Sequence, residues 1–202
     1  CFYNDIQMID YLLNRKCIDV NYTGFKRNES PIILAVESNN ISIVHLLLKD
    51  KRVDINLFCE DHKTALYYAC EYNYPEIADM LLEDVRIDIN IPDKNGKTPF
   101  AIACEKGNNY IVKRILERND ADLNTLSNDG SPFGLAVKNW KHKTVKILID
   151  CKRIRFQNEN EENPLHQACL HGNLKMVELL FTIDSNLLNK NVIDDIKIIK
   201  LT

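Results

Sequence analysis

The side chains best suited to metal chemistry lie in one short stretch, at His166, Cys169 and His171. In a helix, His166 and Cys169 would share one face, because residues three positions apart are neighbours there. Imidazole and thiolate are preferred zinc ligands, but a closed structural site takes four ligands and this group offers three. Cys169 also occupies a position that recurs along the chain as a small residue, which favours a place in the core. We therefore predict no bound metal and no cofactor.

Other kinds of catalytic chemistry find no support in the sequence. The short motifs G-x-G-x-x-G, G-x-x-x-x-G-K and H-E-x-x-H, which bind nucleotides or catalytic zinc, do not occur. Carboxylates are abundant, yet none is paired in a recognisable acid and base arrangement. We therefore predict no catalytic residue, no enzyme activity and no small-molecule substrate.

Composition narrows the class of protein. The chain has 202 residues, of which 45% are hydrophobic and 27% charged, with a net charge of −3. These values are typical of a globular protein and give no general attraction to nucleic acid or to an anionic membrane. No apolar run reaches the roughly 18 residues of a membrane-spanning helix. The seven cysteines form no C-x-x-C pair, which favours a reducing, intracellular location in the cytoplasm or nucleus.

The elements that carry these residues follow an internal repeat. Five segments align without gaps: SPIILAV (30–36), TALYYAC (64–70), TPFAIAC (98–104), SPFGLAV (131–137) and NPLHQAC (163–169). Each is followed by an apolar pattern with the spacing of Val112, Ile115 and Leu116, which forms one face of a helix. The repeat therefore predicts pairs of short helices that are stacked along the chain.

Capping signals predict where these helices begin and end. Each inner helix should follow a Ser, Thr or Asn cap and start at residue 31, 65, 99, 132 or 164, in four cases with a proline. An outer helix should follow, for example from Pro75 to Glu83. Inner helices should end near Asn39, Asn73, Gly107 and Gly172, whose residue types tolerate a left-handed backbone. We number the units from the five aligned segments, so that the fourth unit is 131–162. Trp140 takes this position in the fourth unit, so its inner helix should end one residue early, at Asn139. Arg155 replaces a recurrent Asp and predicts a distorted exit from that unit.

The chain resembles an ankyrin-repeat protein. The family motif T-P-L-H-x-A is closest in Asn163-Pro164-Leu165-His166-Gln167-Ala168, and its finger motif is complete in Asp93-Lys94-Asn95-Gly96-Lys97-Thr98-Pro99. The resemblance implies an all-α solenoid of helix-turn-helix pairs joined by hairpin-like fingers. Residues 1–202 would form one array, divided into a truncated first repeat (1–29), internal repeats (30–63, 64–97, 98–130, 131–162), a last recognisable repeat (163–190) and an apolar tail (191–202). We expect a fragment of a longer array, or a tail that folds over the last repeat.

The resemblance also implies where a partner would bind. Family members contact partners through finger tips and the residues that follow the A-C position of each inner helix. The corresponding candidates here are Glu37, Glu71, Tyr72, Glu105, Lys106, Lys138 and His171, together with Lys63 and Lys97 in the fingers. Glu37, Glu71 and Glu105 recur at one position, so we expect a column of like charge that attracts a basic segment. Such a column disfavours nucleic acid.

Two functions are compatible with this interpretation. The first, which we favour, is a protein-interaction scaffold that binds a partner protein or peptide on a concave face. The second is the substrate-targeting arm of a larger enzyme, such as a kinase or ubiquitin ligase, whose catalytic domain lies elsewhere. The full-length reading frame would distinguish them.

Overall fold

The fold is a linear stack of helix pairs. The computed structural model describes residues 6–24, 27–156 and 163–182. The apolar tail at 191–202 and Cys1 lie outside these ranges. Within them the helices are Ile6–Leu13 (α1), Pro31–Glu37 (α2), Ile41–Lys49 (α3), Ala65–Tyr72 (α4), Pro75–Glu83 (α5), Pro99–Lys106 (α6), Asn109–Leu116 (α7), Pro132–Lys138 (α8), His142–Ile149 (α9), Pro164–Leu170 (α10) and Leu174–Leu180 (α11).

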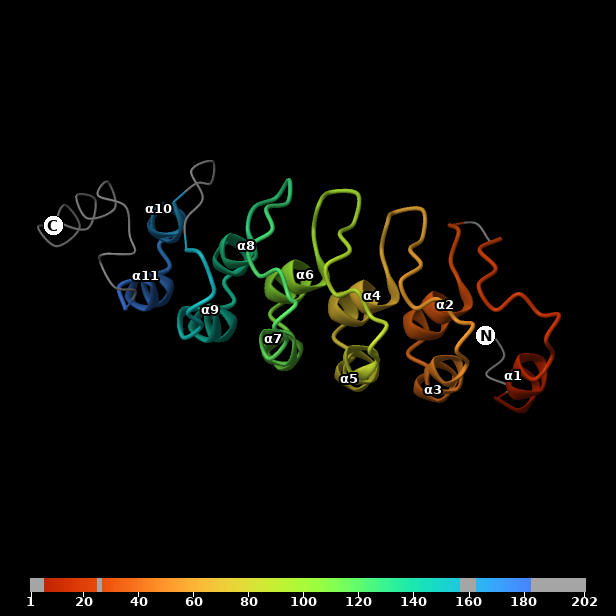
Figure 1. The fold of residues 1–202 in the computed structure, drawn as a ribbon. Coiled ribbons are helices and arrows are strands. Elements are labelled where there is room, and N and C mark those ends of the chain that lie inside the picture. Colours follow the sequence, from red (N-terminus) through yellow and green to blue (C-terminus); the bar gives the residue numbers. More distant parts are fainter. Residues whose placement is uncertain (1–5, 25–26, 157–162, 183–202) are drawn as a thin grey trace, which may run out of the picture.

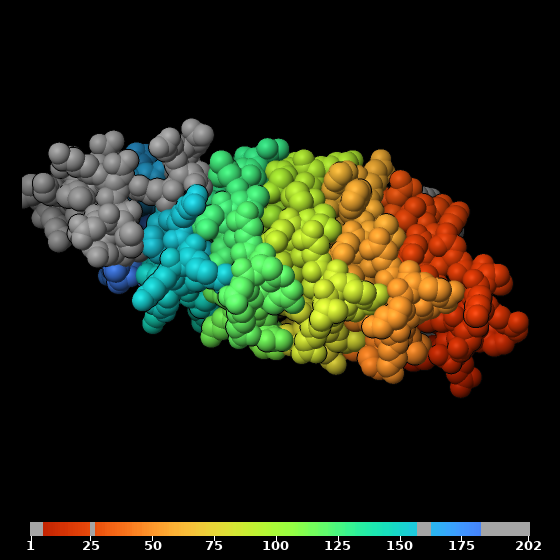
Figure 2. Space-filling model, in the orientation of Figure 1, coloured from red at the N-terminus to blue at the C-terminus, as the bar shows by residue number. Residues whose placement is uncertain are grey.

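The helices form two rows along the long axis of the molecule. The inner helices α2, α4, α6, α8 and α10 lie in the row next to the fingers, and the outer helices α3, α5, α7, α9 and α11 form the second row (Figure 1). Successive parts of the sequence appear as successive bands along the elongated body (Figure 2). In the described ranges no helix is long and apolar enough to cross a membrane. The stack gives each unit contacts with its neighbours on either side.

The inner helices begin where the capping signals predict. Four of the five caps accept a hydrogen bond from a backbone N–H in the first turn, as at Thr98, whose Oγ1 lies 3.2 Å from the nitrogen of Ala101. Ser30 occupies the same position with extended backbone, but its side chain does not cap the helix. These caps satisfy N–H groups that would otherwise lack a partner at the helix start.

A left-handed residue lies at or just after the end of the inner helices, as predicted: it is the cap itself in α4 and α6 and the residue after the cap in α2 and α10. Asn39, Asn73, Gly107 and Gly172 have φ of 52°, 59°, 80° and 65°. The fourth unit ends its helix at Lys138 with Asn139 as the cap, one residue earlier than α6. Trp140 nevertheless adopts φ of 57°. A left-handed L-residue costs about 1–2 kcal/mol, and packing of the indole against the core and edge-on against His171 offsets this cost.

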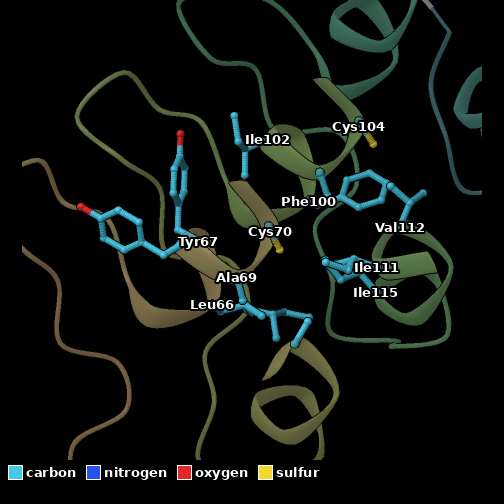
Figure 3. Close-up of a cluster of buried hydrophobic side chains, with 14 of the residues drawn as sticks. Leu66, Tyr67, Ala69, Cys70, Phe100, Ile102, Cys104, Ile111, Val112 and Ile115 are labelled. Carbon is cyan, nitrogen blue, oxygen red and sulfur yellow. The ribbon is translucent and has the colours of Figure 1, made fainter. Parts of the chain in front are cut away.

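The core lies between the two rows and within the inner row. The recurrent alanines Ala35, Ala69, Ala103, Ala136 and Ala168 are all fully buried. Figure 3 shows how Phe100 and Cys104 of α6 lie beside Ile111, Val112 and Ile115 of α7, with Cys70 of α4 on the other side. Small residues in the inner row let neighbouring helices approach closely, while the larger residues of the outer row fill the remaining space.

A larger side chain at the alanine position tests this packing. We expect Ala103→Leu to lower the free energy of unfolding by about 1–3 kcal/mol, because the added carbons have no free volume at a fully buried helix junction. Urea unfolding followed by circular dichroism measures the change. A neutral result would mean that Ala103 does not lie between helices.

Neighbouring units are also connected by a ladder of asparagines. The side chain of Asn56 donates to the carbonyl of Arg86 and accepts from the backbone N–H of Asp88, both at 2.8 Å. Asn21, Asn90 and Asn124 make the same pair of bonds to the unit that follows each of them. Each of these side chains therefore fixes the spacing between consecutive units.

The exit from the fourth unit at Arg155 was predicted to be distorted, but the asparagine ladder continues through it unchanged. The backbone N–H of Arg155 donates to Oδ1 of Asn124 at 2.7 Å, as Asp88 does to Asn56. The bond uses the backbone, so the type of side chain at this position does not alter it. The carboxylate of Asp88 also accepts a hydrogen bond from the N–H of Asn90, and an arginine side chain has no acceptor with which to make such a bond.

Candidate functional site

The fingers and the ends of the inner helices form one face of the array, which we call the inner face. The second residue after the small core position is exposed in every unit: Ser38, Tyr72, Lys106, Asn139 and His171. The residue before it is half-buried at Glu37, Glu71 and Glu105 and exposed at Lys138 and Leu170. Because these side chains follow directly after buried helix positions, the core fixes their backbone.

The column of like charge predicted for the glutamates is neutralised by ion pairs in the structure. Glu37, Glu71 and Glu105 do recur in register, but each is held by a cation from a finger. Arg27 lies 3.1 Å from Glu37, Lys63 lies 2.8 Å from Glu71, and Lys97 lies 2.5 Å from Glu105. The alignment of the internal repeats predicted that the glutamates share one position, but it treated Lys63 and Lys97 as separate contacts for a partner. The inner face of the first three units is therefore a row of ion pairs.

Lys97 is the most deeply placed of these cations. It is 8% exposed, and its ammonium lies between Glu105 and Asp129, which is 2.9 Å away on the next finger. Burial opposes the charged form, but hydrogen bonds to the two carboxylates prevail and raise the pKa of Lys97. The same contact lowers the pKa of Asp129. Lys97 thus connects its own finger to the next one and holds Glu105 and Asp129 in place on the inner face.

The tyrosines of the second unit divide between core and surface. Tyr67 and Tyr68 are buried, and the hydroxyl of Tyr67 donates to Asp93 at 3.0 Å. Burial raises the pKa of both phenols, so they stay protonated. Tyr72 is 45% exposed and stacks on Tyr68 with ring centroids 5.8 Å apart. Tyr67 and Tyr68 thus belong to the core, and Tyr68 contacts Cys59 of the preceding repeat at 3.6 Å. Tyr72 offers an exposed aromatic surface that stacks on the buried ring of Tyr68.

The fourth unit departs from this pattern and is hollowed. Glycines stand at 130 and 134, where the third unit has Lys97 and Ala101, and Lys138 stands where the third unit has Glu105. The finger cation and the helix carboxylate are therefore both missing from this unit. A groove of about 470 Å³ opens there, lined by Leu126, Asp129, Gly130, Gly134, Val137 and Lys138 among others.

Comparison with known proteins identifies the family. The model described as "Ankyrin repeats (3 copies)" matches residues 1–93, 53–127, 85–157 and 100–192. The chain belongs to the ankyrin-repeat family. Ankyrin repeats are generally protein-interaction modules.

Solved structures agree on the fold of this ankyrin array. The ankyrin repeat protein EF0377 superposes with a TM-score of 0.81 at 20% identity, covering 91% of this chain and 94% of that one. An ankyrin repeat domain from Acinetobacter baumannii AYE superposes with a TM-score of 0.78 at 20% identity, covering 90% and 93%. No curated protein matches the chain. At this level of identity the likeness concerns the fold alone.

The ankyrin fold does not gather the candidate metal ligands. His166 is exposed, Cys169 is half-buried, and the ring of His171 packs edge-on against Trp140 at 5.3 Å. Among the described residues, no group of three or more His, Cys, Asp or Glu side chains is placed to hold a metal ion. These residues therefore serve packing and surface in the last two units.

A ladder of arginines also supports the ankyrin array, and sequence reasoning missed it. Arg86 donates to the carbonyls of Leu48 and Val53 in the preceding unit and pairs with Asp84 at 2.6 Å. Arg52, Arg118 and Arg153 likewise donate to carbonyls near the C-terminus of the preceding outer helix. The available signal was the spacing Asp50-Lys51-Arg52 and Asp84-Val85-Arg86, which recurs in phase with the repeat.

Proposed function

We propose that this ankyrin array is a scaffold that binds a partner protein or peptide on its inner face, without catalysis. The contacting residues include Glu37, Glu71, Tyr72, Glu105, Lys106, Lys138 and His171, while Lys63 and Lys97 position the glutamates. The proposed setting is intracellular, because Cys70 and Cys104 are buried free thiols suited to a reducing compartment.

The observation that carries this proposal is the surface around Tyr72. An exposed tyrosine whose ring is already ordered loses little conformational entropy on binding, and tyrosine is enriched among the residues that dominate binding energy. The ring centroid of Tyr74 also lies 5.7 Å from that of Tyr72. The ion pair of Lys63 with Glu71 lies next to this aromatic group, with the ammonium 5.5 Å from the ring of Tyr68. A partner would meet a rigid patch with both apolar and charged parts.

Site-specific photocrosslinking tests the proposal. With p-benzoylphenylalanine in place of Tyr72, we expect a discrete crosslinked partner from cell extract. The matched control is the same substitution at Tyr110, which is 50% exposed on the outer helix α7. Tyr72→Ala should weaken capture of that partner by at least about tenfold. Equal crosslinking at both positions, or crosslinking at Tyr110 alone, would contradict a binding site on the inner face.

A further inference from the structure

The fourth unit reverses the charge arrangement of the units before it. In the second and third units, a finger lysine and a helix glutamate close the inner face with an internal ion pair, Lys63 with Glu71 and Lys97 with Glu105. In the fourth unit the finger position is Gly130 and the helix position is Lys138. In this unit the lysine is on the helix rather than on the finger, and Gly130, at the finger position, has no side chain that could pair with it.

Lys138 is consequently an exposed cation beside a hollow. Among the described residues it forms no ion pair, and the nearest finger carboxylate, Asp129, is bound to Lys97 at 2.9 Å. Lys97 is therefore the main cause of the lowered pKa of Asp129, and Lys138 contributes less. Lys138 therefore lines the groove as a cation that no carboxylate among the described residues binds in an ion pair.

The groove offers more than one charge. Gly130 has φ of 123°, a conformation that requires glycine, and the turn is closed by a hydrogen bond from Ser127 Oγ to its carbonyl at 2.8 Å. The turn therefore requires a residue without a side chain at position 130. Leu126, which is 45% exposed, adds apolar area to the lining, whereas Val137 is buried beneath it. Lys97 holds the wall that carries Asp129. In the part of the chain that the structure describes, the hollow thus combines the exposed apolar side chain of Leu126 with Lys138, a cation that forms no ion pair there.

From these observations we infer that the groove of the fourth unit binds an acidic peptide segment, whose Asp or Glu carboxylate pairs with Lys138 and whose adjacent apolar side chain lies against Leu126. The inference rests on the proposed function and narrows it to one site and one partner chemistry. It replaces the basic segment expected from the sequence, because the glutamates that would attract one are already paired. The volume of about 470 Å³ is in the range of ligand-binding clefts.

Selection from a random peptide library provides the probe. Peptides displayed on phage are selected on the wild-type array, and the most enriched sequences are synthesised with a fluorescent label for anisotropy titrations. We expect the enriched peptides to share an Asp or Glu next to an apolar residue. Lys138→Glu should weaken their binding by at least about tenfold, because a like charge then replaces the ion pair.

Two further variants separate this site from the rest of the array. Lys146→Glu makes the same charge change at an exposed position on the outer helix α9 of the same unit, away from the inner face, and should change affinity by less than about threefold. A peptide in which the acidic residue is replaced by lysine should regain binding to the Lys138→Glu variant. Lys138 is exposed, so its substitution should leave the thermal midpoint unchanged.

The outcomes distinguish this inference from the proposed function. Loss of binding in Lys138→Glu with rescue by the charge-swapped peptide supports the acidic-peptide site. If the peptides bind Lys138→Glu as well as wild type but lose affinity with Tyr72→Ala, the inference is wrong and the proposed function stands. If no peptide binds in a way that either variant alters, both are wrong.

Discussion

Phe100→Ala is expected to lower the free energy of unfolding by about 3–5 kcal/mol, the largest effect of any single change considered. Phe100 is 1% exposed and belongs to the central inner helix α6. Its ring lies beside Ile111 and Val112 of α7 in Figure 3. Removing it takes away a large apolar contact and leaves a cavity that the surrounding helices cannot fill, because capped helices of fixed length cannot move far inward.

The central location adds to this effect. In a linear array, each unit is stabilised by its two neighbours, so a defect in the middle weakens two interfaces while one at an end weakens a single interface. Urea unfolding monitored by circular dichroism measures the change. The matched control is Phe58→Ala in a finger, where the ring is 45% exposed and stacks on His62. We expect a change there within about 1 kcal/mol. Equal losses at the two positions would contradict the assignment of Phe100 to the core.

The helices could be predicted residue by residue because their signals are local. An N-cap side chain bonds to a backbone N–H two or three residues later, and a left-handed residue ends a helix within one turn. Thr98 and Pro99 therefore mark the start of α6, and Gly107 marks its end. Repetition then makes these local signals reliable, since the same positions recur in each unit.

The charge arrangement of the candidate site could not be predicted in the same way. Lys97 and Glu105 are eight residues apart, on a finger and a helix, and their contact depends on how the finger folds back. The contact of Lys97 with Asp129 spans two units. The groove arises from two absent side chains, at Gly130 and Gly134, and a reversed charge, at Lys138. Its existence follows from the stacking geometry, which the sequence alone does not contain.

Trp140 illustrates a different limit. The sequence predicts an early end of α8 from its tryptophan, and α8 does end at Lys138, but α2 and α10 end at the equivalent residue with Asn39 and Gly172 at the left-handed position. It does not show that the chain adopts φ of 57° at Trp140 regardless. The connection from inner to outer helix has a left-handed residue at the same position in each of the five units. The packing of the stack therefore overrides the local preference of Trp140.

Arg86→Met is the second change with a large expected effect, a loss of about 2–4 kcal/mol. The guanidinium donates to the carbonyl of Val53 at 2.9 Å and to that of Leu48 at 3.1 Å, and it pairs with Asp84. Methionine keeps much of the apolar volume but none of the donors. The carbonyls at the end of α3 and the largely buried carboxylate of Asp84 then lose their partner.

The same substitution should alter the dependence of stability on pH. Hydrogen bonds from Arg86 lower the pKa of Asp84 below its ordinary value near 4. A carboxyl group whose pKa is lower in the folded state binds fewer protons there than in the unfolded chain, so stability rises with pH in that range. The contribution of Asp84 is present above its unfolded pKa and is lost as the pH falls through its folded pKa.

Thermal unfolding at several pH values between about 2 and 7 tests both parts of this prediction. The wild-type array should lose stability below about pH 4, and Arg86→Met should lose less over that interval because Asp84 is no longer held ionised. The matched control is Arg155→Met, since the hydrogen bond of Arg155 to Asn124 uses its backbone and its side chain is exposed. That variant should keep the wild-type stability at neutral pH and the wild-type slope in acid. If Arg86→Met instead matched this control in both measurements, the arginine ladder would contribute nothing to the cohesion of the array, and the asparagine ladder and the core alone would hold the units together.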